Sequence, residues 1–185
     1  MDKGEKIEIV GELFDRFQEL HEEYVHLWLA YTFLHWDWWI ALGLSLGSWT
    51  FWLIYRNKRS TQRLLHAGIC AILISVSFDY IGTALGLWYY TGKLTPTFPA
   101  WLPFNTCMMP VTIMFLIQTK PHISPWKKGL FFGLLTAFVG EPIFAWAGYY
   151  VMTGWQYYYS VPIYWLIFIV CDWVAKRDTY DALAT

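Results

Sequence analysis

Charged residues are scarce in this chain. Asp, Glu, Lys and Arg make up 15% of its 185 residues, against about 25% in soluble domains. The net charge is −1, so bulk charge gives no sign of a nucleic-acid partner. The chain has only three cysteines, none in a CxxC spacing, which argues against a disulfide framework or a zinc site.

Known catalytic signatures are also missing from the sequence. It contains no nucleophile elbow, phosphate loop, HExxH helix or nucleotide fingerprint. We therefore expect no cofactor and no metal centre. The N-terminus carries acids where a signal peptide would carry an apolar core, so we expect no cleavable signal. A chain of this length leaves room for one domain.

Apolar and aromatic residues are abundant instead, at 57% and 21% of the chain. A spanning helix needs about 20 mostly apolar residues. Five segments reach or approach that length: 38–55, 64–90, 102–118, 129–154 and 157–175. The sequence therefore predicts an all-α, polytopic membrane bundle of about five transmembrane helices over residues 37–176, followed by a short tail at 177–185.

The basic residues predict an orientation for this bundle. Nine of the 13 Lys and Arg residues fall on one side of a five-span arrangement, and the opposite loops carry only Lys93. Because Lys and Arg mark cytoplasmic loops, we expect a multi-pass protein of the cell membrane with its N-terminus outside and its C-terminus in the cytoplasm.

Residues 1–36 predict an acidic amphipathic helix. Apolar side chains recur there at helical spacing, and acids fill the other face. This helix could lie on the outer membrane surface or cap the bundle. Acidic helices are poor partners for anionic lipids, so we favour packing on protein, either as a cap on the bundle or against a protein partner. A break near residues 35–37 would make Asp37 a helix N-cap. Residues 24–39 are also compatible with part of an additional span.

Two acids fall inside predicted spans. Asp79 and Glu141 are each followed seven residues later by a glycine, Gly86 or Gly148, and then by aromatic residues. This pattern suggests a repeat of helical hairpins. Both acids lie near the middle of the membrane, where a carboxylate costs about 2.5–3.5 kcal/mol, so both need a protein interior around them.

Two interpretations of these acids are compatible with the sequence. In one, each carboxyl only fixes helix packing through hydrogen bonds. In the other, Glu141 and Asp79 are catalytic, because a carboxyl held away from water can act as a general acid. The residues expected to bind the substrate are then Asn105, Trp88, Trp146, Tyr149 and Trp165. A third acid, Asp172, is predicted to pair with Lys176 at the inner interface.

Several strings carry a resemblance to known proteins. They are residues 78–90 (FDYIGTALGLWYY), 102–111 (LPFNTCMMPV), and Gly-Glu-Pro-Ile at 140–143 with Gly-Tyr-Tyr at 148–150. In this order they resemble an uncharacterised family of small multi-pass membrane proteins from spore-forming Gram-positive bacteria. The resemblance covers roughly residues 40–170. It implies a topology and carries no catalytic residue.

A remoter likeness, of architecture and residue type, is to the integral-membrane terpene cyclases. It implies that a buried acid protonates an alkene or epoxide and that aromatic faces stabilise the resulting cation. The expected ligand would then be a lipid or isoprenoid taken from among the membrane lipids. The alternatives are a non-enzymatic membrane accessory or sensor, and a proton-coupled transporter of small molecules.

Overall fold

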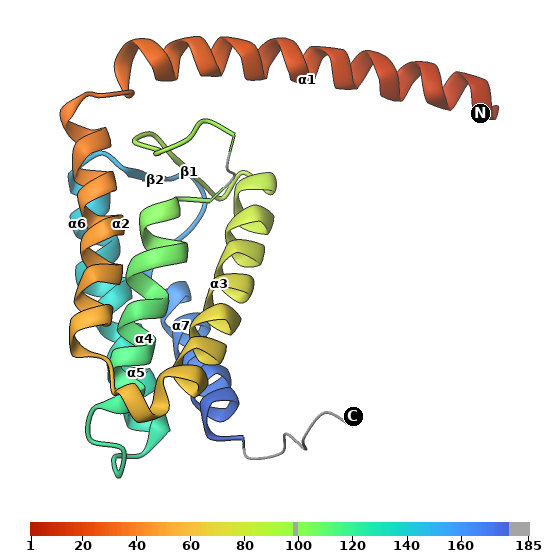
Figure 1. The fold of residues 1–185 in the computed structure, drawn as a ribbon. Helices are drawn as coiled ribbons and strands as arrows, with labels where there is room; N and C mark the ends of the chain where they lie inside the picture. The colour runs from red at the N-terminus through yellow and green to blue at the C-terminus, as the bar shows by residue number, and fades with distance from the viewer. Residues whose placement is uncertain (98–99, 178–185) are drawn as a thin grey trace, which may run out of the picture.

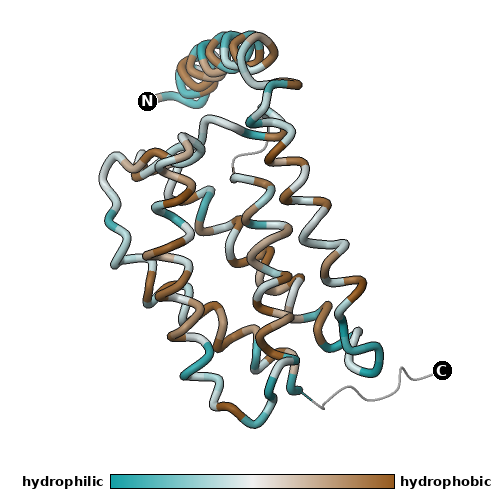
Figure 2. Tube along the Cα trace, turned by 90° about the vertical axis from the view of Figure 1, so that its left-hand side faces the viewer, coloured by the Kyte–Doolittle hydropathy of each residue, from teal (hydrophilic) through white to brown (hydrophobic). Residues whose placement is uncertain are grey.

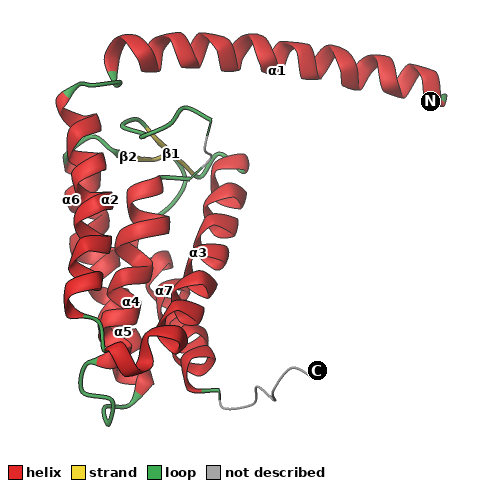
Figure 3. Cartoon of the chain, viewed as in Figure 1, coloured by secondary structure: helices red, strands yellow, loops and turns green. Residues whose placement is uncertain are grey.

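The computed structural model describes residues 1–97 and 100–177, and it is mostly helical (Figures 1 and 3). The helical class predicted from the sequence is confirmed. The α-helices are α1 (Lys3–Tyr31), α2 (Trp36–Tyr55), α3 (Thr61–Ala84), α4 (Met109–Gln118), α5 (Pro125–Leu135), α6 (Glu141–Trp146) and α7 (Tyr157–Lys176). Shorter elements are the 3-10 turn η1 (Lys58–Ser60), the π-helical segments η2 (Pro103–Met108) and η3 (Thr136–Gly140), and the strands β1 (Trp88–Tyr90) and β2 (Tyr150–Met152).

Helices α2 to α7 form a bundle, and α1 lies across one of its ends (Figure 1). Within the described residues, three stretches are long and apolar enough to cross a membrane: Lys58–Ala84, Pro125–Trp146 and Tyr157–Lys176. The apolar helix over Pro103–Gln118 is shorter, and α2 has 20 residues but is rich in Trp, Gly and Ser. Hydrophilic residues gather at the two ends of the molecule (Figure 2).

Two predicted spans, 64–90 and 129–154, are helical only in part. Helix α3 ends at Ala84 and α6 ends at Trp146, and each is followed by a three-residue strand. Gly86 (φ 68°) and Gly148 (φ 82°) adopt the left-handed conformation that ends a helix. The two strands pair antiparallel, with Tyr89 opposite Val151. The segments that the sequence predicts as the outer ends of two spanning helices therefore form a small two-stranded sheet that caps the bundle.

Prolines explain the two π-helical segments. Pro110 follows η2 and Pro142 follows η3, and neither has an N–H to donate to the preceding turn. The helices continue past both prolines through wider turns instead of ending there. At the first site the carbonyl of Thr106 accepts a hydrogen bond from Trp49 Nε1 (3.2 Å). This bond ties η2 to α2.

The buried core fills the half of the bundle farther from α1. It is built by α2, the first half of α3, α4, α5 and the second half of α7, with Phe132, Ile113 and Phe168 among its most buried side chains. Helices α5 and α7 approach closely because Gly133 has no side chain: a Cβ there would lie 2.7 Å from the Val161 carbonyl oxygen. The predicted ion pair of Asp172 with Lys176 is confirmed (2.7 Å).

Residues 32–35 form a non-helical turn that separates α1 from α2. The N-cap residue of α2 is His35, so the prediction of Asp37 as N-cap is wrong. Asp37 lies in the first helical turn, where its carboxylate accepts the Trp38 N–H (3.0 Å). A carboxylate in the first turn still favours the helix through its dipole.

Helix α1 leaves most of its apolar face uncovered by the described part of the chain. Its large apolar side chains are exposed, Phe14 by 58% and Phe17 by 62%. A hydrogen bond from Trp28 Nε1 to the Lys93 carbonyl (2.7 Å) fixes the C-terminal part of the helix to the bundle. The N-terminal part extends beyond the bundle (Figure 1).

Candidate functional site

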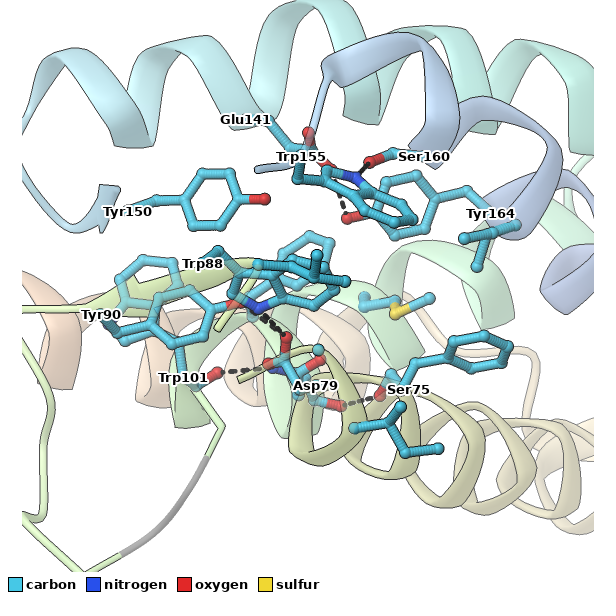
Figure 4. Close-up of a pocket in the computed structure, with 18 of the residues that line it drawn as sticks. Ser75, Asp79, Trp88, Tyr90, Trp101, Glu141, Tyr150, Trp155, Ser160 and Tyr164 are labelled. Carbon is cyan, nitrogen blue, oxygen red and sulfur yellow. Dashed lines mark hydrogen bonds between the residues drawn. The ribbon is translucent and has the colours of Figure 1, made fainter. Parts of the chain in front are cut away.

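Both buried acids line one cavity of about 280 Å³. It lies in the half of the bundle nearer α1, between α3, η2, α6 and α7, with β1 and β2 over it. Its other lining residues are mostly apolar or aromatic. Figure 4 shows Asp79 and Glu141 on opposite walls, with the Trp88 ring between them.

Three donors surround Asp79. Trp88 Nε1 (3.0 Å) and Tyr90 Oη (2.7 Å) donate to Oδ1, and Asn105 Nδ2 donates to Oδ2. The absence of a side chain at Gly82 makes room for the Trp88 indole beside α3, since a Cβ there would collide with the ring. The Asp79 carboxylate is therefore held by residues from β1 and η2, and both of its oxygens are occupied.

Glu141 is held less completely. Tyr164 Oη donates to Oε1 (2.8 Å). The second oxygen, Oε2, is buried and has no hydrogen-bond partner within the described chain. The nearest hydroxyl is that of Ser160, which accepts a bond from Trp155 Nε1 (2.9 Å). Its own proton is available to the Glu141 carboxyl group, although Ser160 makes no hydrogen bond of normal geometry to Oε2. A buried polar atom without a partner is unusual and calls for an explanation, such as a ligand or a catalytic role.

The two acids occupy equivalent positions in two matching substructures. Counting 62 residues onward from Asp79, Gly86 and Tyr89 gives Glu141, Gly148 and Val151. At both helix ends the hydrogen bonds repeat: Leu87 N–H to the Gly82 carbonyl, and Tyr149 N–H to the Phe144 carbonyl, each 2.9 Å. The strand register places Tyr89 opposite Val151, its own equivalent.

Side-chain bonds across the strand pair match as well. The hydroxyl of Thr91 donates to the Gly148 carbonyl, and that of Thr153 donates to the Gly86 carbonyl. Each acid also accepts a hydrogen bond from the next helix in the chain, and the donor lies two residues after a proline. Asn105, after Pro103, donates to Asp79, and Tyr164, after Pro162, donates to Glu141. The two halves thus present their acids in the same way and differ in the number of donors around them.

Of the five residues expected to bind a substrate, Trp88 and Asn105 line the cavity. The other three lie elsewhere. Trp146 is 89% exposed, because the last turn of α6 directs it away from the bundle. Tyr149 donates to the Asp37 carbonyl (3.0 Å). Trp165 donates to the Trp126 carbonyl (3.0 Å) and packs against Gly129 on α5.

The cavity lining also includes aromatic residues that the sequence did not single out, among them Tyr90, Tyr150, Trp155 and Tyr164. The repeat contained a signal for one of them. Tyr150 lies nine residues after Glu141, as Trp88 lies nine after Asp79. No such sequence signal identifies Tyr164, because its position in the cavity depends on how α7 packs beside α6.

The exposed part of the lining is apolar. It consists of Phe78, Ile81 and Leu85 on α3, which are 46%, 54% and 68% exposed. Among the described residues of the lining, the only ionisable side chains besides the tyrosines are the two acids. The outer surface of the bundle beside the cavity is therefore apolar along α3.

Comparison with protein-family models, curated proteins and solved structures finds no match for this chain.

Proposed function

We propose that the chain is a five-span protein of the cell membrane, with α1 and the N-terminus outside and the C-terminus in the cytoplasm. In this arrangement α2 and the η2–α4 helix cross the membrane beside the three long apolar stretches. The charge distribution supports the orientation. The bases cluster after α2, between α4 and α5 and at the end of α7, at the end of the bundle opposite α1 (Figure 1).

We propose further that the cavity binds an isoprenoid or similar unsaturated lipid and that Glu141 is its acid. The single observation that carries this proposal is the Oε2 atom of Glu141, which lacks a partner in an apolar, aromatic cavity. An apolar ligand gains free energy by entering such a cavity. In this proposal the ligand enters from the bilayer between the apolar side chains of α3 that border the cavity.

The chemistry is an acid-catalysed isomerisation or cyclisation. Glu141 gives the proton on Oε2 to an alkene carbon, which leaves a carboxylate on the protein and a carbocation on the ligand. The rings of Trp88, Tyr150 and Trp155 stabilise the cation. Loss of a proton from a neighbouring carbon returns it to Glu141, so the reaction needs no other reactant. Asp79, with both oxygens occupied, serves as a fixed negative charge.

The cavity volume limits the ligand. About 280 Å³ is slightly below the roughly 300–1,000 Å³ of typical small-molecule sites. The cavity therefore holds the reacting end of the molecule, and a longer tail lies among the lipids outside Phe78 and Leu85.

The proposal is tested by lipid extraction and mass spectrometry of cells that express the wild type, Glu141→Gln or Asp172→Asn. Asp172→Asn removes a buried carboxylate outside the cavity and is the matched control. We expect a lipid product that the wild type and the control form and that Glu141→Gln loses. Unchanged lipids in all three, with equal protein levels, would favour an accessory, a sensor or a transporter instead.

A further inference from the structure

A second cavity, of about 660 Å³, lies under α1 on the other side of β1. Helix α1 contributes Phe17, Gln18, His21 and Tyr24 to its lining, and Lys93 lies in the loop after β1. Trp88 and Tyr90 line both cavities. These two side chains therefore form a wall between the apolar cavity of Glu141 and a more polar space at the outer end of the bundle.

Among the described residues that line this second cavity, Lys93 is the only Lys or Arg. Its Nζ lies 5.6 Å from the centre of the Tyr24 ring, and its carbonyl is fixed by Trp28. Burial lowers the pKa of Lys93, and attraction by Asp79 partly offsets this effect. No carboxylate appears in the described lining of this cavity, so the ammonium group has room for an anion.

Tyr24 supplies a second group suited to a ligand. Its hydroxyl oxygen is buried and has no hydrogen-bond partner in the part of the chain that the structure describes. Both Tyr24 and Lys93 line the same space. The buried, unpartnered Tyr24 hydroxyl calls for an explanation, and an anion that also contacts the Lys93 ammonium group would supply one.

The acids of α1 do not cancel the positive charge of this cavity. Phe17 and Tyr24 are seven residues apart, about two helical turns, so they lie on one face of the helix. The acids lie on the opposite face, at positions 8, 12, 15, 19, 22 and 23. The helix thus directs its acids away from the bundle and an apolar face with His21 toward it.

We propose that the cavity under α1 binds the anionic group, a phosphate or carboxylate, of an outer-leaflet amphiphile, with Lys93 Nζ and Tyr24 Oη as donors. The proposal rests on the membrane orientation given above and is independent of the chemistry of Glu141. The apolar side chains of α1 beyond the bundle, such as Val10 and Phe14, continue the same face and contact the acyl chains of that leaflet.

The test is thermal unfolding of the full chain in detergent, titrated with phosphatidylglycerol, with diacylglycerol, which lacks the phosphate group, or with inorganic phosphate. We expect phosphatidylglycerol to raise the Tm of the wild type and diacylglycerol to have little effect. Because a charge-assisted hydrogen bond is lost, Lys93→Gln should bind phosphatidylglycerol about 10- to 100-fold more weakly. Tyr24→Phe, which keeps the ring, should weaken binding less.

Three controls make the result decisive. Lys127→Gln removes an exposed base at the other end of the bundle and should bind as the wild type does. Glu141→Gln should also bind normally, which separates this site from the proposed reaction. If inorganic phosphate raised the Tm as much as phosphatidylglycerol does, the site would bind free phosphate. That result would overturn the proposal that the anion belongs to a lipid headgroup. Equal binding of both lipids, or unchanged binding by both Lys93→Gln and Tyr24→Phe, would overturn the site.

Discussion

At the scale of single residues, Asp79 and Glu141 have the same position in two matching substructures and different surroundings. Asp79 accepts three hydrogen bonds, and Glu141 accepts one from Tyr164. The first acid is suited to holding β1 and η2 together. The second keeps an oxygen free for a ligand, which is why the proposed proton transfer is assigned to Glu141.

This difference predicts unequal losses of stability. In Asp79→Asn, an amide N–H₂ replaces one carboxylate oxygen and can no longer accept a hydrogen bond from the surrounding donors. We therefore expect a loss of about 1.5–3 kcal/mol in the free energy of unfolding. In Glu141→Gln, the amide oxygen still accepts from Tyr164, and the loss should stay below about 1 kcal/mol. Denaturant unfolding in detergent measures both. Equal losses would contradict the assignment of separate roles.

A second residue-scale prediction concerns Gly82, which makes room for the Trp88 ring. Gly82→Ala should overpack the wall of the cavity and cost about 1–3 kcal/mol. In a Trp88→Ala background the added methyl group meets no ring, so the cost of Gly82→Ala should largely disappear. The double-mutant cycle in unfolding free energy measures this coupling. Strictly additive effects would show that the two residues do not touch.

At the scale of elements, the strand pair β1–β2 depends on two glycines that end helices α3 and α6. Both have positive φ, where a side chain costs about 1–2 kcal/mol. Gly86→Ala and Gly148→Ala should therefore each lower the unfolding free energy by about that amount.

The matched control is Gly43→Ala, in the middle of α2, where an added Cβ meets nothing within 4 Å. Alanine favours a helix over glycine by about 0.8–1 kcal/mol, so this variant should be neutral or slightly more stable. The same unfolding experiment covers all three variants. A stabilised Gly86→Ala or Gly148→Ala would mean that the helices do not end there.

The sequence was sufficient to find the helical class, the two acids and the glycines that follow them. It missed the strands because Trp88–Tyr90 and Tyr150–Met152 lie inside continuous apolar runs, where no alternation separates a strand from a helix. It also placed Trp146 in the site, although the orientation of a side chain at the end of α6 depends on the π-helical turn before it. Lys128 was read only as a topology signal, yet its Nζ donates to the Leu116 (2.8 Å) and Thr119 (2.6 Å) carbonyls at the end of α4.

At the scale of the whole molecule, the packed core and the cavity divide the bundle. The core lies toward the end that carries most of the bases, and the cavity lies toward α1, under the strand pair. In the proposed function, the core end holds the fold and the cavity end admits a ligand from the side. In the proposed orientation, the site lies in the outer half of the membrane.

The orientation is predicted to show in cysteine labelling of intact cells. In a chain whose three native cysteines are replaced by Ala, Glu8→Cys on α1 should react with a membrane-impermeant maleimide. Lys120→Cys, between α4 and α5, should react only after the membrane is permeabilised. The reverse pattern would invert the topology and place the site in the inner half.

The central claim is that an unsaturated lipid occupies the cavity beside Glu141, and photo-crosslinking tests it most directly. The purified full chain would be irradiated with a diazirine-bearing isoprenoid alcohol, and the adducts mapped by mass spectrometry. We predict adducts on cavity residues such as Trp88, Tyr150 and Ile163, which an excess of unlabelled isoprenoid removes. Adducts confined to exposed residues such as Trp146, unaffected by that excess, would contradict the account.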